Sequence, residues 1–466
     1  MNLPATIFRE YDIRGTVGDQ LTAQVARAIG QAFATLAWER LGRPPRIAVG
    51  RDNRPSGAEL SGAAREGLVD GGAVALDVGE LPTPALYFST HTLGVDGGMQ
   101  VTGSHNPPQF NGLKLMLSGE AIYGGAIQSL REMIEDNRVE TRVGGRHETH
   151  GNVLPSYRDA IVQRNGPLPR PVKVVVDCGN GVSSLVAVDT LRRLGASVVP
   201  LFCESDGTFP NHHPDPTVLE NLRELQAAVR REGAELGIAF DGDGDRIGAV
   251  DEQGRAVFGD LLLVLLGRDL ARRRGPGHAV IFDVKCSEVL PRELERVGLE
   301  PVMWKTGHSL IKQRMKELHA PLAGEMSGHM FFAGDWYGFD DALFAAARLL
   351  RYLAEQGGPL SRLLADLPQT VSTPELRVDC PDERKFAIVR RAAEHFAARY
   401  PVATLDGVRI SFAEGWGLLR ASNTQPVLVL RFEATSEAAL ARYRAEVEGW
   451  LATQGEGGGG GDRMRP

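Results

Sequence analysis

The sequence predicts an α/β protein built from three similar α/β domains and a smaller C-terminal α+β domain. Three observations lead to this prediction. One strand–helix–strand pattern occurs three times, its copies begin more than a hundred residues apart, and the last hundred residues follow a different pattern. A chain of 466 residues also has room for about three or four domains of ordinary size.

Each of the three copies contains an apolar strand, a polar loop, a helix, a glycine and a second strand. The strand segments are predicted at 46–52 and 73–79, at 172–181 and 197–202 around a helix at 185–196, and at 278–287 and 300–307 around a helix at 290–299. This order is the signature of a βαβ unit in a mostly parallel sheet. The wide spacing of the copies favours three domains over one large doubly wound sheet.

The last hundred residues predict a domain of another type. Residues 406–422 and 426–434 have the pattern of paired strands, and residues 436–454 have that of an amphipathic helix. The glycine-rich end of the chain has the composition of a flexible tail. The expected boundaries are 1–145, 146–251 and 252–367 for the α/β domains, 368–455 for the α+β domain and 456–466 for the tail.

Composition and charge exclude several classes of function. The net charge of −7 is opposite to the basic balance of most nucleic-acid and membrane-surface binders, so we expect neither partner. No apolar stretch has the length of a membrane span, and the N-terminus lacks the pattern of a secretory signal. The four cysteines are scattered singly, which argues against zinc and favours a reducing, cytoplasmic setting. Nothing in the sequence indicates an oligomeric state.

A stiff loop surrounds one serine in the first predicted domain. Residues 101–115 read VTGSHNPPQFNGLKL, so Ser104 lies between Gly103 and a run that ends in two prolines. Proline removes a backbone donor and restricts the residue before it, which excludes a helix here and argues against a strand interior. Ligands of α/β sheets bind beyond the C-terminal ends of strands, where this loop lies. We therefore expect the loop to be part of a ligand site.

Three aspartates spaced by two residues follow an apolar strand. In an extended segment alternate side chains point to the same side, so the carboxylates of Asp241, Asp243 and Asp245 are expected to converge. Such a cluster repels itself unless a cation lies among the oxygens, and an all-oxygen set suits magnesium, calcium or manganese rather than zinc. A solvated acidic turn is the alternative. A calcium loop of the EF-hand type is excluded because Arg246 stands where that loop needs glycine.

Together these features indicate phosphoryl chemistry. Magnesium keeps open positions for phosphate oxygens, and Arg246 adds a cation suited to a phosphoryl group. The hydroxyl of Ser104 is then a possible acceptor.

Three further loops carry polar groups that suit a sugar phosphate. Glu325, Ser327 and His329 alternate between glycines, and a carboxylate with an imidazole can recognise sugar hydroxyls. Lys305 and His308 lie in another glycine-containing turn. Structural histidines and ordinary turns are the alternatives for these loops. A phosphate dianion would suit the arginine, hydroxyls and turn amides of a last loop, which comprises Arg420, Ser422, Asn423 and Thr424.

Six segments together resemble the α-D-phosphohexomutases, most closely the phosphomannomutase/phosphoglucomutase branch. In the family's order, over nearly the whole chain, they read FREYDIRG, VGRDNRPSG, VTGSHNPPQFNGLKL, FDGDGDR, GEMSGH and RASNTQP. The resemblance implies three α/β domains with mixed sheets and a C-terminal α+β domain around a central cleft. It places the phosphoserine, metal-binding, sugar-binding and phosphate-binding loops in the first to fourth domains, in that order.

The same resemblance implies a role for each residue of the site. Ser104 carries the phosphoryl group in the resting enzyme, so its hydroxyl is expected to be exposed. Arg14 and Lys114 flank the phosphoserine, and His329 is the candidate general acid or base. The implied magnesium ligands are Ser104, Asp241, Asp243 and Asp245. The implied substrate-binding residues are Tyr11, Arg246, Lys285, His308, Glu325, Ser327, Arg420, Ser422, Asn423 and Thr424.

The function implied is that of an isomerase acting as an intramolecular phosphotransferase. It interconverts hexose 1-phosphate and hexose 6-phosphate, of glucose, mannose or both, with Mg²⁺ as cofactor. Glucose 1,6-bisphosphate or mannose 1,6-bisphosphate is the intermediate and activator, and small hexose phosphates are the partners.

Three alternatives remain for this function. A phosphoglucosamine mutase is the nearest, although that branch usually has glutamine where this chain has Met326. A magnesium-dependent sugar phosphatase leaves the serine and phosphate loops unexplained. A sugar-phosphate sensor does not need both the serine loop and the aspartates.

Overall fold

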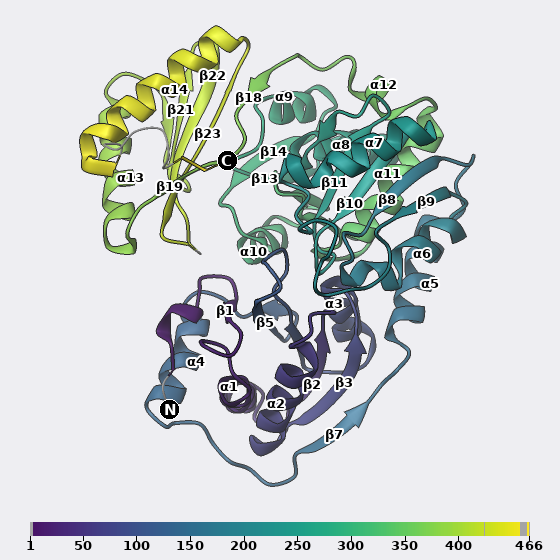
Figure 1. Cartoon of the computed structure of the whole chain (residues 1–466), viewed down its shortest axis with the longest axis vertical. Coiled ribbons are helices and arrows are strands. Elements are labelled where there is room, and N and C mark those ends of the chain that lie inside the picture. The colour runs from purple at the N-terminus through teal and green to yellow at the C-terminus, as the bar shows by residue number, and fades with distance from the viewer. Residues whose placement is uncertain (1–2, 424, 457–463, 466) are drawn as a thin grey trace.

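The chain forms four sheets with helices packed against them, as the computed structural model shows (Figure 1). The structure describes residues 3–423, 425–456 and 464–465, so most of the predicted tail at 456–466 lies outside the described residues. The first three sheets are mixed and the fourth is antiparallel, which confirms the predicted fold class. We call the four sheets with their helices the first to fourth units.

The first unit carries the N-terminal part of the chain, drawn in purple and blue in Figure 1. Its strands run in the order β1-β5-β4-β2-β3-β7, with β6 paired to β5. The strands are β1 (Ile13–Thr16), β2 (Arg46–Arg51), β3 (Val74–Glu80), β4 (Gly97–Val101), β5 (Phe110–Leu117), β6 (Glu120–Ala121) and β7 (Arg146–Thr149). The helices are α1 (Ala23–Leu41), α2 (Gly57–Asp70), α3 (Thr83–Thr92) and α4 (Gly125–Glu135).

The second unit has the strand order β12-β11-β10-β8-β9. Its strands are β8 (Lys173–Asp177), β9 (Ser197–Leu201), β10 (Leu236–Phe240), β11 (Ile247–Asp251) and β12 (Ala256–Val257). Its helices are α5 (Val153–Asn165), α6 (Ala187–Arg193) and α7 (Arg223–Glu232).

The third unit has the order β14-β13-β15-β16-β17. Its strands are β13 (Ala279–Asp283), β14 (Glu300–Trp304), β15 (Leu322–Gly324), β16 (Met330–Ala333) and β17 (Tyr337–Asp340). Its helices are α8 (Gly259–Arg274), α9 (Val289–Arg296), α10 (His308–Leu318), α11 (Ala342–Gln356) and α12 (Leu360–Leu364).

The repeated sequence pattern corresponds to a repeated topology. In each of the first three units, three parallel strands are followed by an antiparallel one: β3-β2-β4 by β5, β9-β8-β10 by β11, and β14-β13-β15 by β16. The strand and helix segments predicted from the three copies therefore form as expected. Because parallel strands end at the same edge of a sheet, the loops that follow β4, β10 and β15 come from equivalent positions.

The fourth unit is an antiparallel sheet, with α13 and α14 packed against it (Figure 1). Its strands are β18 (Val371–Ser372), β19 (Leu376–Asp379), β20 (Val402–Ala403), β21 (Val408–Phe412), β22 (Gly415–Ala421), β23 (Val427–Ala434) and β24 (Met464–Arg465). Its helices are α13 (Asp382–Ala397) and α14 (Glu437–Leu451), the latter capped by Ser436, whose hydroxyl accepts from the amide of Ala439.

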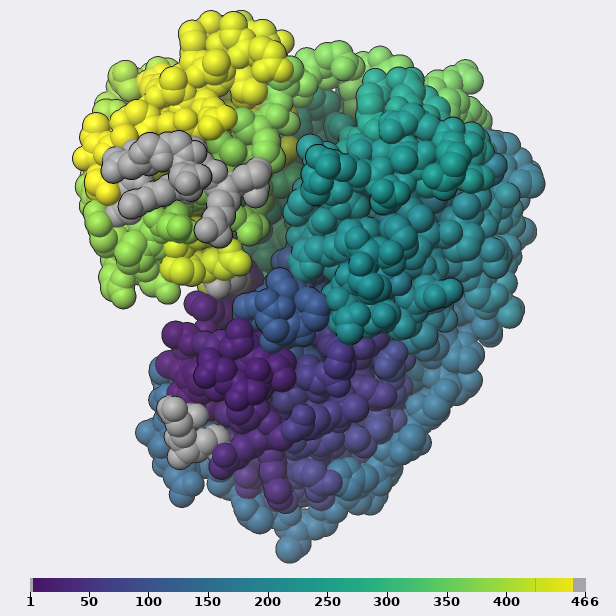
Figure 2. All heavy atoms as spheres, in the orientation of Figure 1, coloured from purple at the N-terminus to yellow at the C-terminus, as the bar shows by residue number. Residues whose placement is uncertain are grey.

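The apolar core is divided into several clusters. The largest extends through the second and third units into the adjoining part of the first and includes Tyr87, Tyr157 and Phe282. Most of the first unit has a cluster of its own around Phe33 and Leu115. The fourth unit has a buried cluster of its own around Phe396 and Phe432. On the face shown in Figure 2, the fourth unit (yellow-green) and the first unit (purple) project on either side of a hollow next to the teal atoms of the second and third units.

The contact between the third and fourth units combines a few apolar side chains with hydrogen bonds. Trp416 and Leu418 of β22 pack against Val284. The Arg409 guanidinium lies over the Trp416 ring at 3.8 Å and donates to the Val284 and Cys286 carbonyls. None of the helices in the described part of the chain combines the length and apolarity needed to cross a bilayer.

Candidate active site

Ser104 lies in the loop between β4 and β5 and points at the aspartate cluster. Its φ of +49° is in the left-handed region, and its amide donates to Thr102 Oγ1 at 2.8 Å. Its hydroxyl donates to Asp241 Oδ2 at 3.0 Å and lies 3.1 Å from His105 Nδ1. The expectation of an exposed hydroxyl is wrong. Ser104 is only 2% exposed, because its side chain is turned inward onto Asp241 and His105.

Arg14 lies beside the serine loop. Its Nη1 donates to Asn106 Oδ1 at 2.9 Å, and its Nη2 pairs with Asp12 Oδ2 at 2.5 Å. Its Nε is buried and donates no hydrogen bond to the described residues. The guanidinium therefore keeps a free donor next to the loop that carries Ser104.

Sequence reasoning missed the buried pair that fixes this loop, Asp52 and Arg54. Asp52 accepts from Arg54 Nε at 3.1 Å and from Thr102 Oγ1 at 2.7 Å. The two Arg54 Nη atoms donate four hydrogen bonds of 2.6 to 3.0 Å to the carbonyls of Ser104, Asn106, Pro107 and Phe110. One guanidinium thus holds the backbone of the serine and of the loop that follows it. The available signal was a charged pair directly after an apolar strand, in VGRDNRPSG.

Two glycines allow the serine loop to lie against its neighbours. A Cβ on Gly103 would lie 2.5 Å from the Arg54 guanidinium carbon, and one on Gly242 would lie 2.4 Å from the Ser104 carbonyl oxygen. Both distances are shorter than Cβ atoms tolerate. Glycine at 242 therefore lets the aspartate loop touch the serine loop backbone to backbone.

We expect Asp52→Asn to destabilise the protein strongly. The substitution leaves the Arg54 guanidinium buried without its carboxylate, and breaking such a pair costs about 3–5 kcal/mol. Thermal unfolding followed by circular dichroism measures the effect as a lower Tm. The control is Asp70→Asn, which breaks the exposed Arg27–Asp70 pair and should leave the Tm nearly unchanged. Equal shifts in the two variants would contradict the importance of the buried pair.

The three aspartates converge as predicted, but a turn rather than an extended strand brings them together. Residues 241–246 follow β10 as a turn, with Gly244 at a φ of +77°. Asp241 Oδ1 caps this turn by accepting from the amides of Asp245 (3.0 Å) and Arg246 (3.1 Å). The three aspartates are fully buried, and one oxygen of each lies within 4.8 Å of the others.

Lys114, on β5, is the cation that faces this cluster. Its Nζ donates to Asp243 Oδ2 at 2.7 Å and to Asp245 Oδ2 at 2.5 Å. Burial by itself lowers the pKa of Lys114, but the two carboxylates outweigh burial and raise this pKa well above its usual value. Burial and the charges of Asp245 and Asp243 raise the pKa of Asp241 well above its usual value.

The aspartate oxygens fit a divalent metal ion. Oδ1 of Asp243 and Oδ1 of Asp245 are buried and accept no hydrogen bond from the described residues. Three carboxylates face two cations, the Lys114 ammonium and the Arg246 guanidinium, which leaves an excess of negative charge in a buried place. Unused carboxylate oxygens with excess negative charge are a donor set that suits a hard cation such as Mg²⁺.

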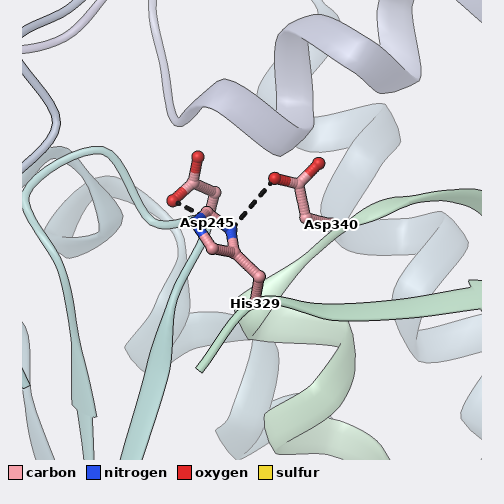
Figure 3. Close-up of side chains that lie close together, drawn as sticks. All are labelled: Asp245, His329 and Asp340. Atoms are coloured by element: carbon pink, nitrogen blue, oxygen red, sulfur yellow. Dashed lines mark ion pairs between the residues drawn. The ribbon is translucent and has the colours of Figure 1, made fainter. Parts of the chain in front are cut away.

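His329 joins the aspartate loop to the third unit (Figure 3). Its Nδ1 lies 3.1 Å from Asp340 Oδ2 and 3.6 Å from Asp245 Oδ1, and its Nε2 accepts from Arg246 Nε at 3.0 Å. Because an arginine N–H can only donate, the proton of a neutral imidazole belongs on Nδ1, facing the two carboxylates. The lone pair is then on Nε2.

Asp340, at the end of β17, is a site residue that the sequence did not reveal. It is fully buried, and besides His329 it lies near His308 (3.7 Å) and Lys312 (2.9 Å). Burial opposes its ionisation, but Lys312 and the two histidines lower the pKa of Asp340 well below its usual value. Burial, followed by the charge of Lys312, lowers the pKa of His308. Asp340 follows an aromatic strand without any flanking motif, so no pattern marked it.

The Glu325 carboxylate organises the sugar-binding residues that were predicted in the third unit. Glu325 Oε1 accepts from the amide of Gly307 at 2.6 Å, and Glu325 Oε2 accepts from Ser327 Oγ at 3.1 Å. This carboxylate therefore fixes the turn that leads into α10, where His308 is the first residue. Lys285 Nζ donates to Glu375 Oε1 at 2.7 Å, and although burial opposes it, Lys285 lowers the pKa of Glu375 to about 2.

The loop after β22 reaches the site through Tyr11. The Tyr11 hydroxyl donates to the Thr306 carbonyl at 2.8 Å and accepts from Asn423 Nδ2 at 2.8 Å. One side chain of the first unit thus connects the third and fourth units. Arg420 pairs with Asp406 Oδ2 at 3.0 Å, and Ser422 is buried. The remaining predicted residue of this loop, Thr424, lies outside the described residues.

The fold and the site define the class of this protein. A four-unit α/β protein with a serine hydroxyl directed at buried carboxylates that could hold a metal ion has the arrangement of a phosphotransferase of the phosphohexomutase type. Family models of phosphoglucomutase/phosphomannomutase match the chain along its length. Alpha/beta/alpha domain I matches residues 5–140, domain II residues 155–254, domain III residues 258–371 and the C-terminal domain residues 375–449. The chain belongs to the phosphoglucomutase/phosphomannomutase family.

Individual relatives agree with this assignment. The chain is 49% identical over 450 residues to a phosphomannomutase/phosphoglucomutase of Pseudomonas aeruginosa, covering 95% of this chain and 94% of that protein. It is 45% identical over 441 residues to a phosphoglucomutase of Neisseria gonorrhoeae, covering 94% and 95%. A crystal structure of a family protein from Burkholderia thailandensis is similar with a TM-score of 0.89 at 46% identity, covering 97% of this chain and 98% of that one.

Proposed function

We propose that this enzyme interconverts hexose 1-phosphate and hexose 6-phosphate, with glucose, mannose or both as the sugar. The observation that carries the proposal is the Ser104 hydroxyl, 3.0 Å from Asp241 within a cluster of three buried carboxylates. These carboxylates would hold a metal ion beside a phosphoryl group carried by the hydroxyl. Relatives named phosphomannomutase/phosphoglucomutase at 49% identity support the same reaction.

Ser104 is the residue that gives and takes the phosphoryl group in this proposal. As phosphoserine it donates the group to the free hydroxyl of a hexose monophosphate, and the 1,6-bisphosphate so formed then turns around. Ser104 takes back the other phosphate, and the isomer leaves. Asp241, Asp243 and Asp245 would hold Mg²⁺, which supplies electrostatic stabilisation of the transferring phosphoryl charge.

The chain's own cations assist this transfer. Lys114 and Arg14 flank the serine loop, and Arg14 keeps a free Nε donor for a phosphate oxygen. Phosphoryl transfer depends mainly on positioning and on neutralising charge, which fixed ammonium and guanidinium groups provide. The Asp52–Arg54 pair holds the backbone of Ser104 in place during the phosphoryl transfer.

His329 is the proton acceptor in this scheme. With its ring proton on Nδ1, the lone pair of Nε2 accepts from Arg246 in the resting arrangement. When the Arg246 guanidinium turns to a phosphate, Nε2 is free to take a proton from the attacking sugar hydroxyl. Asp340 holds the ring in the tautomer that this step requires.

We expect Asp340→Asn to lower turnover by roughly 10²-fold, the lower end of what general acid–base catalysis contributes. The amide removes the charge that holds His329 Nδ1–H. Steady-state kinetics would show the loss in kcat rather than in KM. Asp335→Asn is the control, because it makes the same chemical change in the third unit at a carboxylate that pairs with Arg273 and Arg274 rather than with His329. A control variant that loses as much activity as Asp340→Asn would contradict this role.

The sugar and the distal phosphate are assigned to the third and fourth units. We propose that Glu325 and Ser327 bind sugar hydroxyls, with Lys285 and His308 beside them. Arg420, Ser422, Asn423 and Thr424 bind the phosphate that does not react. A bisphosphate that turns around without leaving requires the fourth unit to open and close, and Tyr11 then makes and breaks its bond to Asn423.

Phosphorus NMR tests the reaction directly. The protein is incubated with Mg²⁺, a trace of glucose 1,6-bisphosphate, and glucose 1-phosphate or mannose 1-phosphate in parallel. Growth of a 6-phosphate signal without inorganic phosphate supports the mutase, and the two initial rates give the sugar preference. Release of inorganic phosphate would show a phosphatase instead. Turnover of glucosamine 1-phosphate alone would show a phosphoglucosamine mutase.

A further inference from the structure

Two of the four cysteines, far apart in the sequence, lie side by side in the second unit. Cys178 follows β8 and Cys203 follows β9, and their sulfur atoms are 3.0 Å apart. The two strands are adjacent and parallel, with Asp177 opposite Leu201. The sulfur atoms are in contact, and a disulfide bond would bring them to about 2.05 Å. The fold therefore already places these thiols within reach of each other.

The loops that follow β8 and β9 are built around this pair. The Cys178 amide donates to the Leu201 carbonyl at 3.2 Å, and the Asn180 amide donates to the Phe202 carbonyl at 2.8 Å, so pairing continues beyond the strand ends. Phe202 has a φ of +48°, which is rare for a bulky residue and turns Cys203 back over β8. The Cys203 thiol consequently lies 3.3 Å from the Val176 carbonyl. Backbone strain that serves to place a side chain points to a function for it.

The two thiols differ in access and acidity. Cys178 is buried and Cys203 is half-buried, so an oxidant reaches Cys203 first. The hydrogen bond between the sulfurs lowers the pKa of Cys203, and the same bond, with burial, raises the pKa of Cys178. A partly exposed thiol with a lowered pKa next to a second thiol is the arrangement of an attacked and a resolving cysteine.

We propose that Cys178 and Cys203 form a peroxide-oxidisable pair that closes a reversible disulfide. The Cys203 thiolate attacks one oxygen of hydrogen peroxide, the O–O bond breaks, and a sulfenic acid and, after protonation, water are formed. The Cys178 thiol then attacks the sulfenic sulfur, the S–O bond breaks, and its proton leaves with the hydroxide as a second water. Two thiols and one peroxide thus give one disulfide and two waters, and a dithiol reductant reverses the oxidation.

This pair is connected to the aspartate loop from both sides. Val182, four residues after Cys178, donates its amide to the Gly242 carbonyl at 3.1 Å. Pro214, eleven residues after Cys203, accepts from the Gly242 amide at 3.2 Å. Closing the disulfide shortens the sulfur separation to about 2.05 Å and draws the two segments together around the residue between Asp241 and Asp243. Oxidation therefore lowers mutase turnover, an effect that rests on the proposed function.

Thiol counting and peptide mapping test the disulfide itself. The reduced protein is treated with hydrogen peroxide, and free thiols are titrated in denaturant. We expect the four thiols of the chain to fall to two, with a Cys178–Cys203 peptide pair in the mass spectrum. Cys286 and Cys380, which are both buried, should stay reduced and act as internal references. Four remaining thiols, or a disulfide elsewhere, would overturn the proposal.

Activity measured on the same samples tests the connection to the site. Turnover of the oxidised wild type should fall at least twofold and recover with dithiothreitol, while Cys203→Ser should keep its activity under peroxide. A disulfide that forms without changing the rate would overturn the connection and leave the redox site standing. If reduced protein shows no mutase activity, the proposed function fails, and the thiol count still decides the disulfide. Because that count uses the wild type, it does not depend on the folding of a variant.

Discussion

Ser104→Ala is expected to abolish turnover, with a loss of at least ~10³-fold. The substitution removes the only atom through which the residue can carry a phosphoryl group and leaves the clamp of Arg54 on the loop backbone intact, because Arg54 binds the Ser104 carbonyl and not its side chain. The fold should therefore survive. Coupled-enzyme kinetics measure the activity, and intact mass spectrometry after incubation with glucose 1,6-bisphosphate measures phosphorylation.

The matched control for this experiment is Ser118→Ala. Ser118 shares the left-handed backbone of Ser104, with a φ of +54°, but it is exposed at the far end of β5. Any penalty that comes from alanine in this conformation should appear in both variants, and loss of phosphorylation only in Ser104→Ala. A phosphorylated, active Ser104→Ala protein would exclude the phosphoserine mechanism.

Asp243→Asn is expected to lower turnover by at least ~10²-fold and to weaken metal binding. Asp243 contributes one of the two oxygens of the aspartate cluster that are buried and accept no hydrogen bond from the described residues, and its other oxygen pairs with Lys114. An amide in this place offers one neutral oxygen and an NH2 group, so it cannot both accept from Lys114 and leave an oxygen for the metal ion. Either loss removes charge stabilisation at the transferring group, where a single well-placed interaction is worth about 10²–10³ in rate.

Two measurements separate these effects. Titration calorimetry with Mg²⁺ reports metal affinity, and kinetics at saturating Mg²⁺ report what excess metal restores. Asp159→Asn, on the exposed side of α5, is a control with the same chemical change far from the cluster. If Asp243→Asn binds Mg²⁺ as tightly as the wild type, the aspartate cluster is not the metal site.

The fold was predictable because it rests on local patterns that repeat. Apolar strand segments such as 46–52 and 172–181 alternate with helical segments at a regular distance, and a parallel sheet covered by helices is the arrangement that buries such strands. The antiparallel strand that completes each of the first three units is less clearly marked by a local sequence pattern. The shared core of the first three units also depends on long-range packing, which periodicity does not reveal.

The site was predictable where its functional residues form a short motif in the sequence. Ser104 with its prolines and the three spaced aspartates are local patterns of this kind. Asp52, Arg54 and Asp340 are single charged residues after strands, and their importance arises only when β2, β4 and β17 bring them to their partners. Cys178 and Cys203 are likewise far apart in the sequence, and only the fold brings them into contact after β8 and β9.

The separate core of the fourth unit has a consequence for how the molecule unfolds. Its apolar cluster around Phe396 and Phe432 is separate from the cluster of the third unit, and arginine hydrogen bonds and a small apolar cluster around Trp416 connect the two units. Two cores that share little apolar surface need not melt together. Heating should therefore give two calorimetric transitions, and amide hydrogens of β21–β23 should exchange with solvent on a different timescale from those of β8 and β10.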